Sequence, residues 1–538
     1  MTHLGRKLLR VGVVGAGLVG AVAAAQAADW PQWGGADLGR NMVSTETGLP
    51  ESFVARPPGT NVRWSATLGG AVQGNPTVSG GRVFVGTDDA MLDEDSRFTR
   101  THGGMVQCLD EKTGKVLWRL AVPQRMRDRL PQGAHYGEQR LGVCSSPAVQ
   151  GNRVYVVTGS CEVLCLDVNG QADGNDGPFK DEAQYMAGRG HPPIKLGKQD
   201  GDIVWSFDLI DQLGICPHDV AACSPLVDGR FLYTVSCNGV DKPHEKCLRP
   251  DAPSFVCIDS QTGKLLATDV EGLGHRMWHC LWSPPSMGTV NGKKLVFFGG
   301  ADGICYAFEA LTEVPDKPIH FKKVWQFDCD PPEFRLPGGR PVNYYVGDKR
   351  KKYSTNKDDG KYLGPSEIIS APVFHEGRVY TTIGQDPTHG RGRGLLHCID
   401  ASKTGDITAT GNVWTYEGIE RTISSVAISG DLLFTVDLAG HIHCLDVATG
   451  KPHWVYDTHT ETWGTPLVAD GKVYITNKKG MVVMAAAKEP KLLADVHLGA
   501  PSYATPVTAN GTLFVASQNS IWAVQKGAGT STASAAAP

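Results

Sequence analysis

The stretch "GTPLVADGKVYITN" (464–477) runs from a small residue and a proline through a turn with glycine into an alternating apolar segment. The same pattern returns as "ATPVTANGTLFVAS" (504–517), and Pro466 and Pro506 are 40 positions apart. Alternation with a period of two is typical of half-buried strands, and a short link with glycine is typical of a hairpin turn. Each copy therefore predicts the first two strands of one repeated β unit.

The pattern occurs eight times along the chain. The six earlier copies span 74–87, 145–158, 223–236, 283–300, 370–383 and 424–437. Most copies continue into a second pattern, as in "QCLDEKTGKVLW" (107–118) and "HCLDVATGKPHW" (443–454), which predicts two further strands. A four-stranded unit with a period of about 40–45 residues is typical of a propeller blade. The sequence thus predicts an all-β fold, an eight-bladed β-propeller of four-stranded antiparallel blades.

The last unit lacks an outer strand, because the eighth copy ends at Ala523 and Val524. The segment "NVRWSATL" (61–68) resembles the outer strands of other units, which carry a tryptophan such as Trp118 or Trp454. We expect residues 61–68 to complete the last blade and close the ring, since an open ring would leave an exposed sheet edge.

The N-terminal region has the layout of an export signal. Basic residues at positions 6–10 precede a short apolar run (11–25) and a small-residue cleavage pattern that ends at Ala27. We expect residues 1–27 to be a signal peptide, 28–60 an N-terminal segment, 61–526 the propeller and 527–538 a disordered tail. The mature chain is therefore expected to be extracytoplasmic, either periplasmic or secreted.

The net charge of −4 argues against a nucleic-acid partner. No later segment is apolar enough to predict a membrane span, and we expect a monomer.

The repeat pattern, a proline followed by an alternating strand and then "LD-x-x-TGK-x-x-W", resembles the PQQ-like β-propeller repeat family, named for pyrroloquinoline quinone (PQQ). The opening "DWPQWGG" (29–35) is similar to that of secreted bacterial members. The resemblance spans residues 29–525. It implies the propeller fold, and a function like that of quinoprotein alcohol dehydrogenases or of an outer-membrane assembly lipoprotein.

The cysteines fall into two groups. Five share one repeat position, which Ala307 holds in the fourth blade: Cys108, Cys165, Cys257, Cys398 and Cys444. Exchange with alanine indicates a tight buried slot, where a free cysteine behaves as a small apolar side chain. Among the others, Cys237 and Cys247 bracket one loop and are the candidate disulfide. The repeated tryptophans are expected to pack between blades.

Long loops are concentrated on one face of the predicted ring. In a propeller, the loops between blades and the loops between the second and third strands open on the same face, which we call the funnel face. Polar and aromatic residues precede several inner strands there: His135, Tyr136, Glu138, Arg140, His218, Asp219, His275, Arg276, Trp278, His279, Glu367, Glu420, Arg421, Glu461, Trp463 and Tyr503. Such convergent groups suit a small polar ligand or a cell-envelope protein as the partner.

A quinoprotein dehydrogenase is the alternative function. PQQ needs a stacking aromatic, arginines for its carboxylates and usually Ca²⁺. The candidates are Trp278 or Trp463 for stacking and Arg140, Arg276 or Arg421 for the carboxylates. Glu138 or Asp219 would bind calcium or act as the catalytic base. The sequence has no adjacent cysteine pair and no C-x-x-C-H haem motif, which weighs against this function. We therefore prefer a binding scaffold.

Two groups of residues have the chemistry of a metal site. His275 and His279 are four apart, as two ligands on a helix would be, although Gly274 and the prolines at 284–285 disfavour a helix. The segment "CPHDVAAC" (216–223) offers Cys216, His218 and Cys223, in a spacing that matches no zinc pattern. Both groups stay open as metal candidates.

Overall fold

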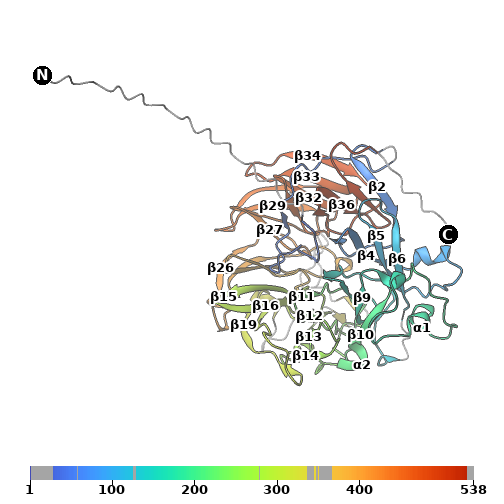
Figure 1. The fold of residues 1–538 in the computed structure, drawn as a ribbon. Coiled ribbons are helices and arrows are strands. Elements are labelled where there is room, and N and C mark those ends of the chain that lie inside the picture. Colours follow the sequence, from blue (N-terminus) through green and yellow to red (C-terminus); the bar gives the residue numbers. More distant parts are fainter. Residues whose placement is uncertain are drawn as a thin grey trace.

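In the computed structural model, eight β-sheets are arranged as the blades of a ring (Figure 1). The structure describes Met1 and residues 28–56, 59–124, 129–277, 279–335, 345–346, 349–350 and 366–529. From the innermost strand outward, the first blade is β3 (Thr77–Ser79), β4 (Arg82–Asp88), β5 (Gly104–Asp110) and β6 (Val116–Val122), and the second is β7 (Ala148–Gln150), β8 (Arg153–Val157), β9 (Glu162–Asp167) and β10 (Ile203–Asp208). The third is β11 (Leu226–Asp228), β12 (Phe231–Val235), β13 (Phe255–Asp259) and β14 (Leu265–Thr268), and the fourth is β15 (Ser286–Val290), β16 (Lys293–Gly299), β17 (Ile304–Glu309) and β19 (Lys323–Asp328).

The other four blades repeat the antiparallel pattern. They are β22 (Val373–His375), β23 (Arg378–Thr382), β24 (Leu396–Asp400) and β26 (Asn412–Tyr416); β27 (Ala427–Ser429), β28 (Leu432–Val436), β29 (His441–Asp446) and β30 (Pro452–Asp457); β31 (Leu467–Ala469), β32 (Lys472–Asn477), β33 (Gly480–Ala485) and β34 (Leu492–His497); β35 (Val507–Ala509), β36 (Thr512–Ala516), β37 (Ser520–Val524) and β2 (Val62–Thr67). The predicted eight-bladed propeller is confirmed.

A few short elements decorate this ring. The strands β1 (Val43–Ser44), β18 (Ile319–His320) and β25 (Gly405–Asp406) add parallel pairs to β31, β14 and β19, and β20 (Tyr345–Val346) pairs with β21 (Lys349–Arg350). The α-helices α1 (Glu182–Ala187) and α2 (Leu209–Leu213) each span fewer than two turns. In the described part of the chain, no helix has the length and apolar character to cross a membrane. The expected signal peptide and residues 530–538 of the expected tail lie outside the described residues.

The ring closes through the N-terminal strand, as predicted. The blue strand β2 pairs antiparallel with the red strand β37, so the first strand of the ring completes the last blade (Figure 1). The indole of Trp64 on β2 then donates a hydrogen bond to the Glu111 carbonyl of the first blade at 2.8 Å. Strand β2 therefore belongs to the last blade and also contacts the first blade.

The repeated cysteine position is the small half of a cross-strand pair. Cys108, Cys398 and Cys444 lie directly opposite Trp118, Trp414 and Trp454, and Ala307 lies opposite Trp325. In each of these pairs the register shifts immediately afterwards, as at a β-bulge. A tryptophan leaves room for only a small partner, which explains why cysteine and alanine interchange. These sulfurs are buried free thiols, as expected.

The tryptophans pack between blades, also as predicted. The indoles of Trp205 and Trp414 donate to carbonyls of the following blade, at Ser260 and Val447, over 2.9 and 3.1 Å. The glycine of the "TGK" turn packs against the tryptophan side chain of the preceding blade. At Gly450, which has φ +69°, an added Cβ would lie 2.5 Å from the Trp414 ring. The repeated glycine and tryptophan are thus two halves of one contact.

Residues 28–55 form a belt against the innermost strands of all eight blades. Backbone and side-chain hydrogen bonds join the belt to β3 at Val78, β7 at Val149, β11 at Val227, β15 at Met287, β22 at Phe374, β27 at Ile428, β31 at Val468 and the β35 turn at Asn510. These contacts lie at the middle or end of each strand, whereas the funnel-face loops precede the strands. The belt therefore closes the channel at the end away from the funnel face.

Arg40 is the most deeply buried charge of the belt, with no exposed side-chain surface. Its guanidinium donates to the carbonyls of Pro225 and Pro285, each at 2.9 Å, and to the carbonyl of Trp33. Burial lowers the pKa of Arg40 to about 9, so the group remains cationic at neutral pH. A single side chain thus connects the belt to the third and fourth blades.

Candidate functional site

A ring of small polar residues surrounds the channel where the inner strands begin. Among neighbouring members of this set, the backbone N–H donates to the side chain of the next blade, from Asn75 to Ser146 at 2.8 Å and from Ser146 to Ser224 at 2.9 Å. Pro284 and Ala371 hold the position in the fourth and fifth blades and interrupt the chain of hydrogen bonds there. Ser425, Thr465 and Thr505 continue the chain, and Thr505 donates back to Asn75 at 2.7 Å. In six of the eight blades, the residue before the inner strand therefore has a structural reason to be small and polar.

This ring lines a central cavity of about 220 Å³. Trp33 of the belt, Trp282, Trp463 and Tyr503 contribute aromatic surface, and the rings of Trp463 and Tyr503 are 4.3 Å apart between centroids. Asp386 is the one charged side chain in the described wall. Because the belt closes one end of the channel, this cavity is blind and opens toward the funnel face.

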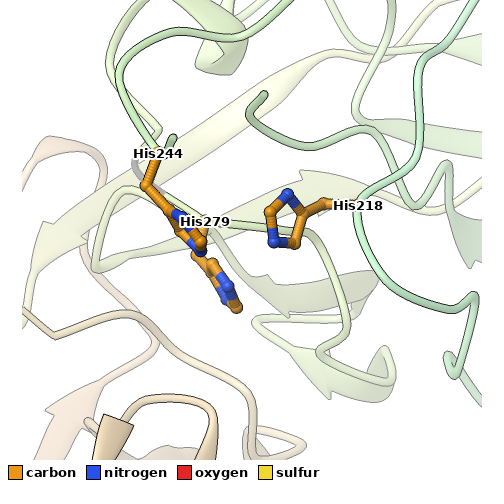
Figure 2. Close-up of side chains that lie close together, drawn as sticks. All are labelled: His218, His244 and His279. Atoms are coloured by element: carbon orange, nitrogen blue, oxygen red, sulfur yellow. The ribbon is translucent and has the colours of Figure 1, made fainter. Parts of the chain in front are cut away.

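Beside the cavity, three imidazoles meet from three loops (Figure 2). His218 precedes β11, His244 lies between β12 and β13, and His279 precedes β15. Their ring centroids are 4.6, 4.7 and 5.0 Å apart, and one nitrogen from each lies within 4.8 Å of the others. We call these three residues the histidine cluster. Trp282 links it to the cavity, since its ring lies 4.8 Å from that of His279.

Backbone hydrogen bonds fix the three loops against one another. The N–H of Gly239 donates to the Cys216 carbonyl, and the N–H of Val240 donates to the His279 carbonyl, both at 2.9 Å. The N–H of Leu281 donates to the Asn238 carbonyl at 3.2 Å. The histidine positions are therefore held by main chain rather than by side-chain packing alone.

Two histidines of the cluster are neutral at physiological pH. Burial lowers the pKa of His244 to about 3, and burial together with the neighbouring His279 lowers that of His218. Although burial also disfavours a charged His279, its hydrogen bond to the Glu367 carboxylate raises the pKa of that imidazole. The Nδ1 atom of His279 lies 3.3 Å from Glu367 Oε1, and both residues are buried.

Asp219 is a second buried carboxylate at this place. Burial raises its pKa, but the hydrogen bond from His135 and the neighbouring His218 outweigh burial and hold the pKa below its usual range. His135 Nε2 lies 2.9 Å from Asp219, and Glu138 pairs with Lys242 at 3.3 Å on the outer side of the same loops. Asp219 is thus close to the cluster, while Glu138 is part of the exposed rim.

The two metal groupings expected from sequence spacing do not form. His275 ends a single 3-10 turn, Leu273–His275, and its exposed ring lies 2.7 Å from the exposed Asp251, whereas His279 is buried. Cys216 and Cys223 contact backbone carbonyls and belong to no ligand group of the described residues. The correction has a simple cause, because spacing in a loop does not fix the direction of a side chain. Of the five residues expected in these two metal groupings, His218 and His279 are the two that come together.

The candidate disulfide is not formed in the structure, where Cys237 and Cys247 are both free and buried. The Cys237 thiol lies 3.8 Å from the Val235 carbonyl, and Cys247 accepts a hydrogen bond from Asn238 at 3.4 Å. The two residues therefore take part in separate contacts within the loop.

The arginines expected to bind a quinone are in other contacts or outside the cavity. Arg276 donates to Asp302 at 2.8 Å and to Tyr306 at 2.6 Å, and buried Arg421 donates to Ser366 at 3.2 Å. Arg140 lines a separate small cavity between the first two blades. Trp278 lies outside the described residues. The described wall of the central cavity thus holds a carboxylate and no arginine, which does not fit the tricarboxylate PQQ.

Sequence reasoning missed His244 and His389. The ring of His389 lies 4.8 Å from His279 and 5.4 Å from His244. Both residues come from loops between second and third strands, whose length marked the funnel face. A search for histidines in those loops, together with those that precede inner strands, would have found the group.

Asp437 on the funnel face predicts an acid-sensitive contribution to stability. Burial raises its pKa, but hydrogen bonds from His441 and His443, at 3.1 and 3.2 Å, outweigh burial and hold the pKa below its usual range. This stabilisation is present above the unfolded-state pKa of about 3.9 and is lost as the pH falls through the folded-state value. We expect Asp437→Asn to lower the free energy of unfolding, measured by urea denaturation at pH 7, by about 1–3 kcal/mol. The gap in free energy between the variant and the original chain should narrow at pH 3. An equal gap at both pH values would contradict this explanation.

Comparisons with known proteins give one family match. The family model described as outer membrane protein assembly factor BamB matches residues 86–175 and 322–532, more than half of the chain. Polyvinylalcohol dehydrogenase from Sphingopyxis sp. (strain 113P3) is 22% identical over 528 residues, which cover 79% of this chain and 69% of that protein.

Solved structures share the fold at low identity. A europium-containing methanol dehydrogenase aligns with a TM-score of 0.54 and 13% identity, covering 91% of this chain and 90% of its own. BamB from Moraxella catarrhalis aligns with a TM-score of 0.48 and 12% identity, covering 86% of this chain and 96% of its own. At these identities the likeness concerns the propeller fold alone.

Proposed function

Because the chain belongs to the BamB-like family of PQQ-like β-propeller repeat proteins, we propose that it is an exported propeller that binds a small hydroxylated ligand in its central cavity. The observation that carries the proposal is the blind cavity with aromatic walls and a ring of hydroxyl and amide side chains. Concave sites of this kind, mostly apolar with a few convergent polar groups, are the usual places for small-molecule binding.

The composition of the cavity wall favours a neutral, hydroxyl-rich molecule. Trp282, Trp463 and Tyr503 present flat apolar surfaces, while Asn75 and Thr465 present polar atoms close to them. Asp386 disfavours an anion and accepts hydrogen bonds from a hydroxyl group. The similarity to a polyvinylalcohol dehydrogenase agrees with a polyhydroxylated ligand, so short polyols and sugars are the first compounds to test. A cell-envelope protein on the same face is the other partner considered.

The proposal does not include PQQ or Ca²⁺, because the residues described in the cavity wall include none of the arginines that the quinone carboxylates need. It does include export, which the basic and apolar pattern of residues 6–27 supports. A mature protein whose mass corresponds to a start at Ala28 is the expected result of expression in a bacterium, and an uncleaved chain in the cytoplasm would contradict export.

Ligand binding is tested with tryptophan fluorescence and calorimetry on the full mature chain. We expect a polyol or sugar from a panel of such compounds to change the fluorescence, and Trp463→Ala to weaken its binding about tenfold, since an aromatic contact contributes about 1 kcal/mol beyond its buried area. Tyr456→Ala on the outer strand β30 is the matched control and should bind as the original chain does. Equal weakening by both substitutions would exclude the cavity as the site.

A further inference from the structure

We propose that His218, His244 and His279 bind one divalent transition-metal ion of the class of Zn²⁺ or Cu²⁺ through their Nε2 atoms. The cluster is independent of the ligand proposed for the central cavity, because none of its three residues lines that cavity. The three ligand nitrogens lie within 4.8 Å of one another and come from loops that main-chain hydrogen bonds hold together. A small inward movement of side chains around an ion satisfies zinc–nitrogen distances of about 2.0–2.1 Å.

Each imidazole has its other nitrogen beside an oxygen. His218 Nδ1 lies 2.8 Å from the Val240 carbonyl, and His244 Nδ1 lies 3.0 Å from the Lys242 carbonyl. His279 Nδ1 lies 3.3 Å from Glu367 Oε1. A carbonyl oxygen accepts only from N–H, so the first two rings carry their protons on Nδ1 and the lone pairs on Nε2. Histidines that ligate metals nearly always donate the second nitrogen in this way.

The charges around the cluster favour a cation. Asp219 and Glu367 are buried carboxylates at its edge, and Glu367 Oε2 is buried with no hydrogen-bond partner among the residues that the structure describes. Asp219 Oδ2 lies 3.8 Å from His218 Nε2. Buried charge needs compensation, because burial of an isolated carboxylate is strongly unfavourable. A dication among the three imidazoles adds to the compensation that His135 gives Asp219 and that His279 gives Glu367.

The ligand atoms select the class of metal. Imidazole nitrogen suits zinc, copper, nickel and cobalt, while calcium and magnesium prefer oxygen ligands. Three protein ligands leave at least one coordination position open, as in zinc sites that also bind water. The Glu367–His279 pair corresponds to the carboxylate–histidine arrangement that orients a ligand ring, so Glu367 is a positioning residue.

The test is metal titration of the full mature chain after removal of metals with a chelator. Calorimetry with Zn²⁺ should give one equivalent per chain. Titration with Co²⁺ should give the visible absorption of a four- or five-coordinate nitrogen site. His244→Ala and His279→Ala should each weaken binding at least 100-fold, and Glu367→Gln should weaken it about 10–100-fold while it retains the Co²⁺ spectrum.

His275→Ala is the matched control, since His275 is an exposed histidine four positions from His279. It should bind one equivalent with unchanged affinity. Melting curves without metal check that each variant is folded. Zn²⁺ should raise the melting temperature of the original chain and of His275→Ala, raise that of Glu367→Gln less, and leave those of His244→Ala and His279→Ala unchanged. If His244→Ala does not fold, His244→Asn is tested in its place. Binding that survives all cluster substitutions, or the absence of Zn²⁺, Cu²⁺ and Co²⁺ binding by the folded chain, would overturn the proposal.

Discussion

Trp64→Ala is expected to lower the free energy of unfolding by about 3–5 kcal/mol, the usual effect of truncating a buried tryptophan. Trp64 has no exposed surface, and its indole N–H donates to the Glu111 carbonyl at 2.8 Å. Its ring also covers Gly114, where an added Cβ would lie 2.4 Å away. The substitution removes these contacts where the N-terminal strand β2 joins the last blade to the first.

Trp118→Ala distinguishes loss of packing from loss of ring closure. Trp118 is equally buried and donates to the Val168 carbonyl at 2.9 Å, but it joins two blades that are consecutive in sequence. Both variants should have lower urea midpoints. Only Trp64→Ala should also make the last blade accessible to a protease under native conditions, because β2 can then separate from β37. Proteolysis at equal rates in the two variants would show that Trp64 stabilises the protein by packing alone, with no separate effect of ring closure.

Trp64→Phe separates the hydrogen bond from the ring. Phenylalanine keeps most of the apolar contact with Phe514, whose ring centroid lies 6.0 Å away, but has no N–H for Glu111. We expect a loss of about 1 kcal/mol, the net value of one hydrogen bond.

The fold was predictable because each blade repeats the same physical solution. The proline, the turn glycine, the small residue opposite tryptophan and the tryptophan itself recur at fixed positions, so eight weak signals support one another. Residues 28–55 do not repeat, and their partners lie in seven inner strands and in the turn that follows the eighth. For this reason the sequence allowed only an N-terminal segment to be assigned, and the belt was missed.

The sequence predicted on which face of the propeller the site lies, but not which side chains form it. The funnel face follows from loop lengths, and His218 and His279 were both assigned to it. His244 contributes from within a loop of the third blade, and its approach depends on the backbone bond from Val240 to the His279 carbonyl. No spacing in the sequence encodes such a contact. The spacing of His275 and His279 suggested a shared site, but His275 pairs with the exposed Asp251 and His279 with the buried Glu367.

Arg40→Met is expected to destabilise the chain by about 3 kcal/mol and to loosen the belt. The buried guanidinium donates to three carbonyls, and hydrogen bonds to a charged group contribute about 1.5–3 kcal/mol each. Methionine fills much of the space and removes the unfavourable burial of charge, which offsets several kcal/mol. It leaves the carbonyls of Trp33, Pro225 and Pro285 without this donor, however, and each such acceptor costs about 1 kcal/mol or more.

The urea midpoint measures this effect, and Arg56→Met on the exposed end of the same segment is the control. Arg40→Lys should lie between the two, because an ammonium group keeps the charge but lacks the planar fork that reaches three carbonyls at once. Loosening of the belt should also weaken ligand binding, since Trp33 forms part of the cavity wall. An Arg40→Met chain as stable as Arg56→Met would contradict this expectation. It would mean that the other hydrogen bonds of the belt hold it in place, and that the hydrogen bonds of the guanidinium only offset the cost of burying its charge.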